Sequence, residues 1–300
     1  MKRRQRLAGL SLLAVLLGAS SAAAHTPYLV PMNFAVTGDH VTLHAAMTGE
    51  VFFVPERAIP TTAFSLTDPD GTSQTLTGTS FKDLVLIEAP IAGDGTYKIS
   101  TEAPGRRFKM AKVDGKWQMV RPATAGAPPY REDAREAGRA GAENAGANAA
   151  SPQGQQPRRG VDEASLPAGT KIVETQSVTK LETYITKGAP SPVTTTGKGF
   201  ELKPVTHPNE IFSDQDFTFA LLFNGKPVQE LSVDVFRGGN AYDDRKVAAE
   251  TKTDGKGEIR LHLERPGVYL LTARYPERGD PAQEPAAKAY NYALSFEVAP

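Results

Sequence analysis

Apolar and polar side chains alternate along many short segments of this chain. Val41 and Leu43 stand between polar neighbours, and Phe217, Phe219 and Leu221 recur at every second position. Successive side chains of a β-strand point to opposite faces, so this period of two predicts strands with one buried face. By the same reasoning we expect further strands at residues 83–88, 96–101, 107–113, 116–120, 171–186, 228–236, 259–263, 268–273 and 290–298.

Short turn motifs separate the expected strands. Asp114-Gly115 and Asn224-Gly225 are two-residue hairpin signals, because Asp, Asn and Gly tolerate the positive φ that such turns require. Strands at this spacing, with no helical pattern between them, indicate antiparallel sandwiches rather than βαβ units. We therefore expect an all-β fold of two Ig-like or prealbumin-like antiparallel β-sandwich domains.

Two tyrosines occupy related places in the two halves of the chain. Gly95 is followed two residues later by Tyr97, and Gly267 by Tyr269, each at the start of a late strand. In sandwich folds, a tyrosine at such a corner commonly bonds its hydroxyl back to the backbone. This echo favours two modules of similar construction.

The middle of the chain has a different composition. Residues 122–167 contain 12 Ala, 6 Gly and 6 Pro among 46 residues, with few large apolar groups. Such a stretch cannot bury enough surface to offset the entropy lost on ordering. We expect a disordered linker at 122–167, between an N-terminal domain at 25–121 and a C-terminal domain at 168–300.

The first 24 residues have the pattern of a secretory signal peptide. A basic start is followed by an apolar run at residues 7–17 and by three alanines that end at Ala24. We expect cleavage after Ala24 and a periplasmic location. Arg3-Arg4 leaves open whether export follows the Sec or the twin-arginine route.

Composition excludes several classes of protein. The chain has no cysteine, so disulfides, zinc–cysteine sites, iron–sulfur clusters and cysteine nucleophiles are excluded. The expected domains carry no polybasic stretch, which argues against a nucleic-acid partner, and no apolar segment after residue 24 is long enough to span a membrane. The sequence also lacks the nucleophile-elbow, HExxH, phosphate-loop and dinucleotide-binding motifs, so we do not expect an enzyme.

Histidine is the residue type that points to chemistry. Cleavage after Ala24 makes His25 the first residue of the mature chain, where its α-amine and Nδ1 can chelate one metal ion. The ordinary pKa of an α-amine is about 7.7–8.0, so binding near neutral pH releases few protons. Pro27 has no backbone N–H, which blocks chelation by consecutive amides and leaves only this brace-like mode.

A brace of this kind needs a second imidazole. His40 and His44 lie on one face of an expected strand, about 13 Å apart, so one metal ion can take only one of them. His207, before Pro208, lies at an expected strand end, and His262 is given no role. Imidazole ligands suit copper, nickel, cobalt and zinc alike. The alternative is that these histidines are simply solvated.

Several segments resemble a known family. Five segments are similar to the bacterial exported family called domain of unknown function 4198. They are residues 25–31 (HTPYLVP), residues 199–209 (GFELKPVTHPN), Gly225-Lys226-Pro227, Thr253-Asp254 and residues 266–270 (PGVYL). That family is commonly labelled a periplasmic component of nickel or cobalt uptake. The resemblance implies metal handling by an accessory protein that works with a membrane transporter, and it points to His25 and His207.

Three functions therefore remain open. The first is a periplasmic accessory protein that binds nickel, cobalt or copper through His25 and one of His40, His44 or His207. The second is a non-catalytic interaction module for an outer-membrane receptor, a polysaccharide or a protein, which we expect to show an exposed aromatic patch that includes Trp117, Tyr242 or Tyr290. The third, a hydrolase, requires two carboxylates and a histidine in one pocket.

Overall fold

The computed structural model describes residues 26–49, 51–121, 160–239, 243, 247–277 and 279–300. Within these ranges the chain forms β-strands and one short 3₁₀ helix, Glu163–Ser165, and it has no α-helix. The described part of the chain accordingly contains no helix with the length and apolarity needed to cross a membrane. The expected signal peptide at 1–24 and His25 lie outside the described residues.

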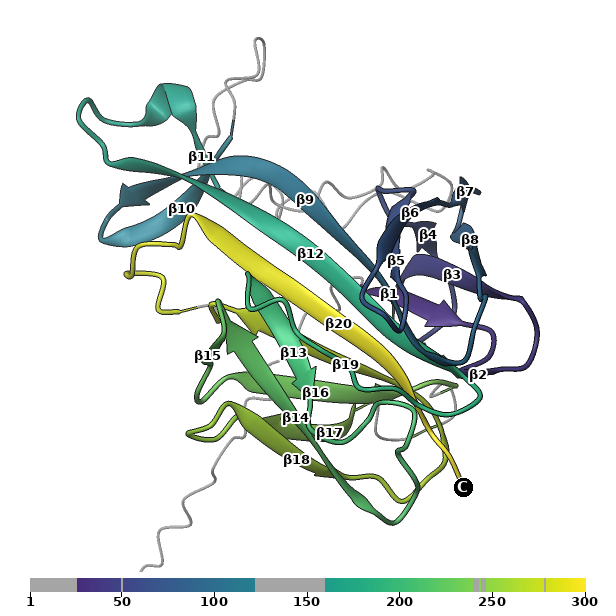
Figure 1. Cartoon of the computed structure of the whole chain (residues 1–300). Helices are drawn as coiled ribbons and strands as arrows, with labels where there is room; N and C mark the ends of the chain where they lie inside the picture. Colours follow the sequence, from purple (N-terminus) through teal and green to yellow (C-terminus); the bar gives the residue numbers. More distant parts are fainter. Residues whose placement is uncertain (1–25, 50, 122–159, 240–242, 244–246, 278) are drawn as a thin grey trace, which may run out of the picture.

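The strands form three sheets (Figure 1). The first is antiparallel, with the order β1 (Thr26–Pro31), β3 (His40–Thr48), β8 (Val85–Pro90) and β7 (Thr79–Ser80), and with β4 (Arg57–Ala58) also on β3. The third is antiparallel and consists of β13 (Phe200–Pro204), β14 (Asp216–Phe223), β15 (Lys226–Pro227) and β18 (Glu258–His262).

The second sheet is the largest and connects the whole molecule. Its order is β11 (Val161–Asp162), β10 (Lys116–Arg121), β9 (Gly95–Val113), β12 (Ile172–Lys187), β20 (Lys288–Val298), β19 (Gly267–Tyr275), β16 (Ser232–Arg237) and β17 (Val247–Lys252). β5 (Ala63–Thr67) pairs with β9 and with β6 (Ser73–Thr77), and β2 (Ala35–Val36) pairs with β12.

Two hydrophobic cores lie on the two faces of this central sheet. The first core joins the first sheet to β5, β9 and β12 through residues such as Leu43, Leu66 and Ile99. The second joins the third sheet to β12, β19 and β20 through residues such as Phe219, Leu271 and Phe296. Each core is closed by two sheets, so the predicted fold class, all-β with two antiparallel β-sandwiches, is confirmed.

Residue alternation and turn chemistry explain the strands. β3 and β18 bury alternate residues, as the period of two predicts. Asp114 and Gly115 both have positive φ between β9 and β10, as do Asn224 and Gly225 between β14 and β15. These are the two-residue hairpin turns that the sequence predicts.

The expected hydrogen bonds from Tyr97 and Tyr269 back to the backbone are also confirmed. The Tyr97 hydroxyl donates to the Gly93 carbonyl at 2.8 Å, and the Tyr269 hydroxyl donates to the Arg265 carbonyl at 2.6 Å. In both cases the acceptor lies four residues upstream of the tyrosine. Each sandwich thus has the tyrosine corner found in Ig-like folds.

The structure differs from the expected elements in three places. Residues 228–231 are not strand, so the strand expected at 228–236 is wrong over its first half and begins at Ser232. The strands expected at 96–101 and 107–113 are one long strand, β9. β12 and β20 run in the same direction and form a parallel pair, whereas sequence analysis expected antiparallel sheets.

The linker and the domain boundaries can be compared only in part. Residues 122–159 lie outside the described residues. The end of the expected linker, Val161–Asp162, is a strand that pairs with β10, so residues 160–167 belong to the ordered fold. Because β9 and β12 come from the two sides of the linker and pair along most of their length, the two expected domains share one sheet. The division into an N-terminal domain at 25–121 and a separate C-terminal domain stays a prediction, with residues 160–167 ordered ahead of residue 168.

Candidate functional site

β3 places His40 and His44 on its outer face, where sequence analysis expected them. His40 is exposed, and its Nδ1 lies 2.8 Å from the Asp39 carboxylate. The hydrogen bond and the charge of Asp39 raise the pKa of His40. His44 is half-buried, its Nδ1 lies 3.2 Å from the Tyr28 hydroxyl, and burial lowers its pKa. The two imidazoles have separate partners and do not face a common point.

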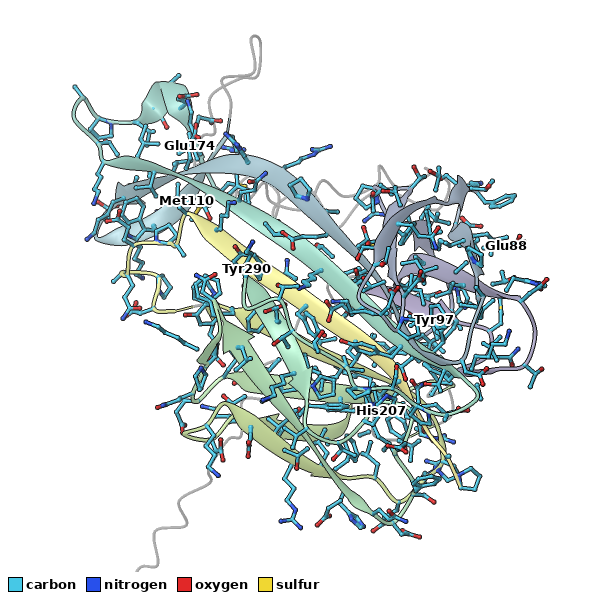
Figure 2. All side chains as sticks on the ribbon, in the orientation of Figure 1. Glu88, Tyr97, Met110, Glu174, His207 and Tyr290 are labelled. Carbon is cyan, nitrogen blue, oxygen red and sulfur yellow. The ribbon has the colours of Figure 1, made fainter. Side chains whose placement is uncertain are left out.

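His207 is engaged at both ring nitrogens. The backbone N–H of Asn209 donates to Nδ1 at 3.2 Å, so Nδ1 is unprotonated and Nε2 carries the proton. Nε2 then donates to the Ser191 carbonyl at 3.1 Å and lies 2.9 Å from the Thr96 hydroxyl. Burial lowers the pKa of His207, which favours this neutral form. His207, which is labelled in Figure 2, therefore connects β9 to the loop after β12 and has no lone pair to offer a metal in this arrangement.

The register of β1 shows how far these rings lie from the start of the described chain. Thr26 pairs with Thr48, whereas His44 pairs with Val30, about 13 Å further along the strand. His40 lies about 13 Å beyond His44. Among the described residues no three His, Asp or Glu side chains come together in a way that could hold a metal ion. A metal site through His25 stays a prediction, and the structure does not gather the other three histidines.

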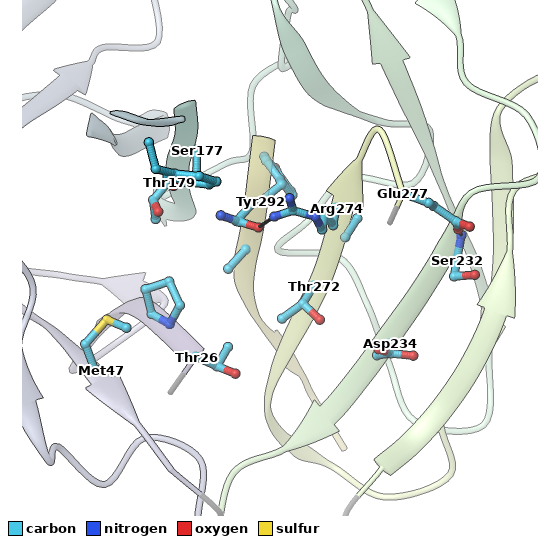
Figure 3. Close-up of a pocket in the computed structure, with 15 residues that line it drawn as sticks. Thr26, Met47, Ser177, Thr179, Ser232, Asp234, Thr272, Arg274, Glu277 and Tyr292 are labelled. Carbon is cyan, nitrogen blue, oxygen red and sulfur yellow. Dashed lines mark hydrogen bonds between the residues drawn. The ribbon is translucent and has the colours of Figure 1, made fainter. Parts of the chain in front are cut away.

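A cleft lies where β1 begins against the central sheet, and we call it the β1 cleft (Figure 3). Its volume is about 650 Å³. The floor is the outer face of four neighbouring strands, which contribute Ser177 and Thr179 (β12), Asn291 (β20), Thr272 and Arg274 (β19), and Ser232 and Asp234 (β16). Thr26, Pro27 and Met47 form one wall, and Phe108 and Glu277 also line the cleft.

The floor residues share one face because their strands are in register. Thr179 pairs with Asn291, and Asn291 pairs with Arg274. In the adjacent row, Thr272 pairs with Asp234. The alternate residues Val233, Leu271 and Tyr292 belong to the second core, and of these only Tyr292 also borders the cleft. Sequence periodicity thus produces a polar floor directly behind an apolar core.

Most polar groups on this floor have no protein partner. Arg274 donates to the Asn291 side chain at 2.6 Å. The side chains of Ser177, Thr179, Thr272 and Asp234 make no hydrogen bond or ion pair with any other described residue. Elsewhere on the same sheet hydroxyls are bonded, as Thr183 is to the Ser295 carbonyl and Thr101 is to the Ala63 carbonyl. The cleft thus brings four available polar side chains together on one face of the sheet.

Asp234 is the most unusual group in the cleft. Burial raises its pKa, and so does the negative charge of Glu250, which pairs with it directly across β16 and β17. Glu277, on the rim, accepts a hydrogen bond from the Ser232 backbone, and this bond lowers the pKa of Glu277. A half-buried carboxylate without a donor favours ligands that supply one.

A second hollow adjoins the β1 cleft, and we call it the β4–β9 hollow. Its volume is about 590 Å³, and it shares Pro27, Met47 and Thr179 with the β1 cleft. Its other lining residues include Ile59, Pro104 and Leu181, with Arg57 and Arg106 at its exposed margin. The two hollows thus form neighbouring sections on either side of the Pro27 and Met47 ridge.

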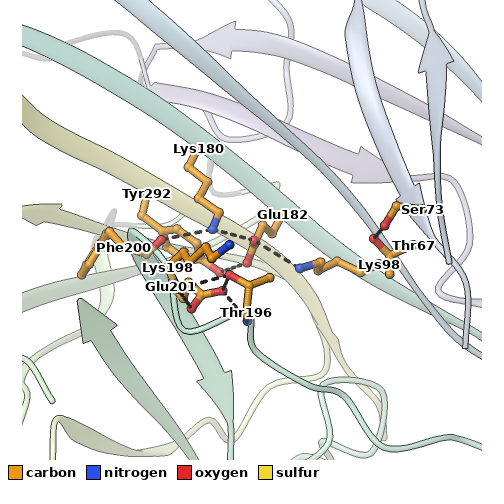
Figure 4. Close-up of polar contacts among 10 residues, drawn as sticks. All are labelled: Thr67, Ser73, Lys98, Lys180, Glu182, Thr196, Lys198, Phe200, Glu201 and Tyr292. Carbon is orange, nitrogen blue, oxygen red and sulfur yellow. Dashed lines mark hydrogen bonds and ion pairs between the residues drawn. The ribbon is translucent and has the colours of Figure 1, made fainter. Parts of the chain in front are cut away.

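A buried charged cluster lies on the other face of β12 (Figure 4). Glu182 is 2% exposed, accepts a hydrogen bond from the Tyr292 hydroxyl at 2.6 Å, and lies 3.3 Å from Lys180 and 3.9 Å from Lys98. Glu201 accepts two hydrogen bonds from Thr196. The carboxylates of this cluster are occupied by protein donors, so we assign it a structural role.

The aromatic patch expected for an interaction module is not found among the described residues. Trp117 is 8% exposed and lies under the Lys171 ammonium. Tyr290 is half-buried and packs against Phe200 and Phe223. Tyr242 lies outside the described residues. Sequence reasoning also missed the β1 cleft, because only the register of four distant strands brings its floor together.

These features define the class: a two-sandwich β protein with an open polar cleft at the start of its first strand. The chain belongs to the family described as "Domain of unknown function (DUF4198)", whose model matches residues 22–277. The resemblance noted in the sequence is thereby confirmed. No curated protein shows a significant match to this chain.

Three solved structures illustrate what this chain is similar to. The D0-D1 domain of Intimin is 10% identical, with 91% of this chain and 97% of that chain covered and a TM-score of 0.22. A tetra-tandem repeat in the extending region of a large adhesion protein is 13% identical (93% and 75% covered, TM-score 0.20). The fibronectin(III)-like modules of Clostridium thermocellum CbhA are 9% identical (90% and 94% covered, TM-score 0.20). At these TM-scores the similarities carry no argument about fold or function.

Proposed function

We propose that this protein is an exported, periplasmic, non-catalytic binding protein whose ligand lies in the β1 cleft. The observation that carries the proposal is the set of unpartnered polar side chains on the cleft floor, Ser177, Thr179, Thr272 and Asp234. A concave site of several hundred Å³ with a few convergent polar groups is typical of ligand-binding sites.

The chemistry of the cleft favours binding over catalysis. Its titratable groups are Asp234, Arg274 and Glu277, and no histidine is among the described residues that line it. Arg274 donates to Asn291, and Glu277 accepts from the Ser232 backbone, so protein partners already engage both groups. Such an arrangement can hold a ligand, whereas acid–base catalysis needs two groups that act on the same atoms.

The proposal is tested by capture on the immobilised mature protein. Polysaccharide, lipid and protein fractions of the native cell envelope are applied to the wild type, to a variant with the cleft filled by Thr272→Trp, and to the control Thr218→Trp on β14. We expect one fraction to be retained by the wild type and the control but lost from the cleft variant. Equal retention by all three proteins, or none, contradicts a binding role for the β1 cleft.

A second candidate is a transition-metal accessory role, for nickel, cobalt or copper, that assists uptake by a membrane transporter. The observation that favours it is that Thr26 lines the same cleft as the carboxylates of Asp234 and Glu277. Carboxylate oxygens can complete the ligand set of a metal ion that a terminal amine and imidazole chelate. The other histidines lie too far along β3, or are too fully bonded, to complete the site.

This candidate is tested by metal titration of the correctly processed chain. A protein that begins at His25 is compared with one that carries a single extra residue before His25, and His44→Ala and His207→Ala serve as further variants. We expect binding to be lost on extension and kept in both histidine variants. Binding that survives the extension contradicts a terminal chelate.

A further inference from the structure

We propose that the ligand of the β1 cleft is an oligosaccharide, with one sugar ring on the polar floor and the next reaching over the Pro27 and Met47 ridge into the β4–β9 hollow. This inference rests on the proposed function and names its ligand class. The observations that carry it are the pattern of donors and acceptors on the floor, the apolar wall and the continuation of the cleft.

The floor offers hydrogen-bonding groups of both kinds at regular spacing. Neighbouring strands are about 4.8 Å apart and same-face residues about 6.6 Å apart along each strand. One row presents Thr179, Asn291 and Arg274, and the next presents Thr272 and Asp234. Hydroxyl and amide groups both donate and accept, whereas Arg274 only donates and ionised Asp234 only accepts. A ligand that carries many hydroxyl groups can satisfy all of them at once.

The wall has the opposite character. Pro27 and Met47 from the first sheet, and Phe108 from β9, border the same cleft and are half-buried. A sugar ring has an apolar face of C–H groups and a polar rim of hydroxyls, so it can contact this wall while it bonds to the floor. Water leaves such an apolar wall favourably, and sugar hydroxyls can replace the water on the floor with equivalent hydrogen bonds.

The β4–β9 hollow extends the site beyond one ring. It shares Pro27, Met47 and Thr179 with the β1 cleft and brings Arg57 and Arg106 to its far margin. Two guanidinium groups there favour a carboxylate substituent, since arginine pairs with carboxylates through two parallel hydrogen bonds. We therefore infer a preference for an oligosaccharide with an acidic sugar over a neutral one.

The floor of the cleft is not built to add a peptide as a further strand. Extended peptides bind by adding a strand to an open sheet edge, where main-chain groups are unpaired. The floor of the β1 cleft is instead the face of four paired strands, so it offers side chains alone.

The test measures binding of defined probes to the full mature chain by titration calorimetry and saturation-transfer NMR. Tetragalacturonate serves as the acidic probe and cellotetraose as the neutral one. We expect both to bind, the acidic probe more tightly. Thr272→Val should weaken both about threefold to tenfold, the effect of one neutral hydrogen bond, and Asp234→Asn about tenfold or more, because a charge-assisted bond is lost.

Matched variants separate the two parts of the site. Thr218→Val removes a half-buried strand hydroxyl outside the cleft and should leave binding unchanged. Arg57→Gln combined with Arg106→Gln should abolish the preference for tetragalacturonate but leave cellotetraose binding intact. The control Lys226→Gln should change neither the preference nor the binding of either probe. Equal affinities of the two probes in the wild type overturn the extension into the β4–β9 hollow.

Failure of the inference can be told from failure of the proposed function. If neither probe binds, and the envelope material retained through the β1 cleft contains no sugar and survives periodate, the oligosaccharide is wrong although the cleft binds a ligand. If no envelope fraction is retained in a cleft-dependent way, the proposed function itself fails.

Discussion

At the scale of single residues, most polar groups in this protein either reach solvent or have a protein partner. Glu182 and Glu201 illustrate the second case, since protein donors surround both. Asp234 differs, because it is half-buried, lacks a donor among the described residues and faces Glu250 across the strand pair. Its ionised form is therefore a destabilising feature of the free protein, retained at the place where we propose that a ligand binds.

This feature makes a prediction about stability. The raised pKa means that the folded protein holds the Asp234 proton more tightly than the unfolded chain does, so its contribution is favourable below the ordinary aspartate pKa of about 3.9 and is lost as pH rises through the folded value. Asp234→Asn should raise Tm by about 1–3 °C at pH 7, and the gain should disappear near pH 3.5. Calorimetry across this pH range checks it, with Asp83→Asn as an exposed control. A lower Tm of Asp234→Asn at pH 7 contradicts it.

Sequence reasoning located single residues well where local rules decide and poorly where distant strands meet. The outer face of β3, with His40 and His44, follows from alternation alone. The bonding of both His207 nitrogens does not, because its partners Thr96 and Ser191 come from separate elements. The floor of the β1 cleft depends on the registers of β12, β20, β19 and β16, and no local motif encodes those registers.

At the scale of elements, turn residues determine where strands reverse. Asn224 and Gly225 both adopt positive φ between β14 and β15, and the position of that turn follows directly from the sequence. Apolar content alone predicted the ends of strands less reliably. Residues 228–231 are apolar in part, and Val228 and Leu231 are buried, yet these residues leave the strand because their hydrogen bonds go to Leu221 and Thr253 across a bend.

The turn yields a prediction with a matched control. Gly225 has a φ of +74°, which an alanine adopts at a cost of about 1–2 kcal/mol, and only ordinary contacts surround the position of a new Cβ. Gly255 lies in a nearby turn without positive φ and with open space around it. Gly225→Ala should lower the free energy of unfolding by about 1–2 kcal/mol, whereas Gly255→Ala should change it little. Denaturant unfolding measures both, and equal effects of the two variants are inconsistent with backbone strain.

At the scale of the whole molecule, the shared central sheet governs behaviour. β9 and β12 pair from Gly95 to Ala111, and β12 takes part in both cores through Leu181 and Tyr184. Sequence analysis recovered both sandwiches but not this sharing, because the composition of residues 122–167 indicated a break between two separate bodies. The long pairing of β9 with β12 overrides that separation.

The shared sheet predicts a single unfolding transition. Loss of either core removes a packing surface from β12, so the two sandwiches should melt together rather than in two steps. Leu271→Ala in the second core and Leu43→Ala in the first should each shift one common transition downward, with equal van't Hoff and calorimetric enthalpies. Two separated transitions in either variant would show that the sandwiches are independent.

The parallel pairing of β12 with β20 also has a consequence for how the protein is made. Thr183 bonds to the Ser295 carbonyl, 112 residues later in the chain, so one side of β12 cannot be covered until the end of β20 has been synthesised. Until then the nascent chain leaves one edge of β12 without its strand partner while residues 188–298 are made. A chain that ends before residue 288 would lack β20 and leave this edge of β12 open to pairing with strands of other chains.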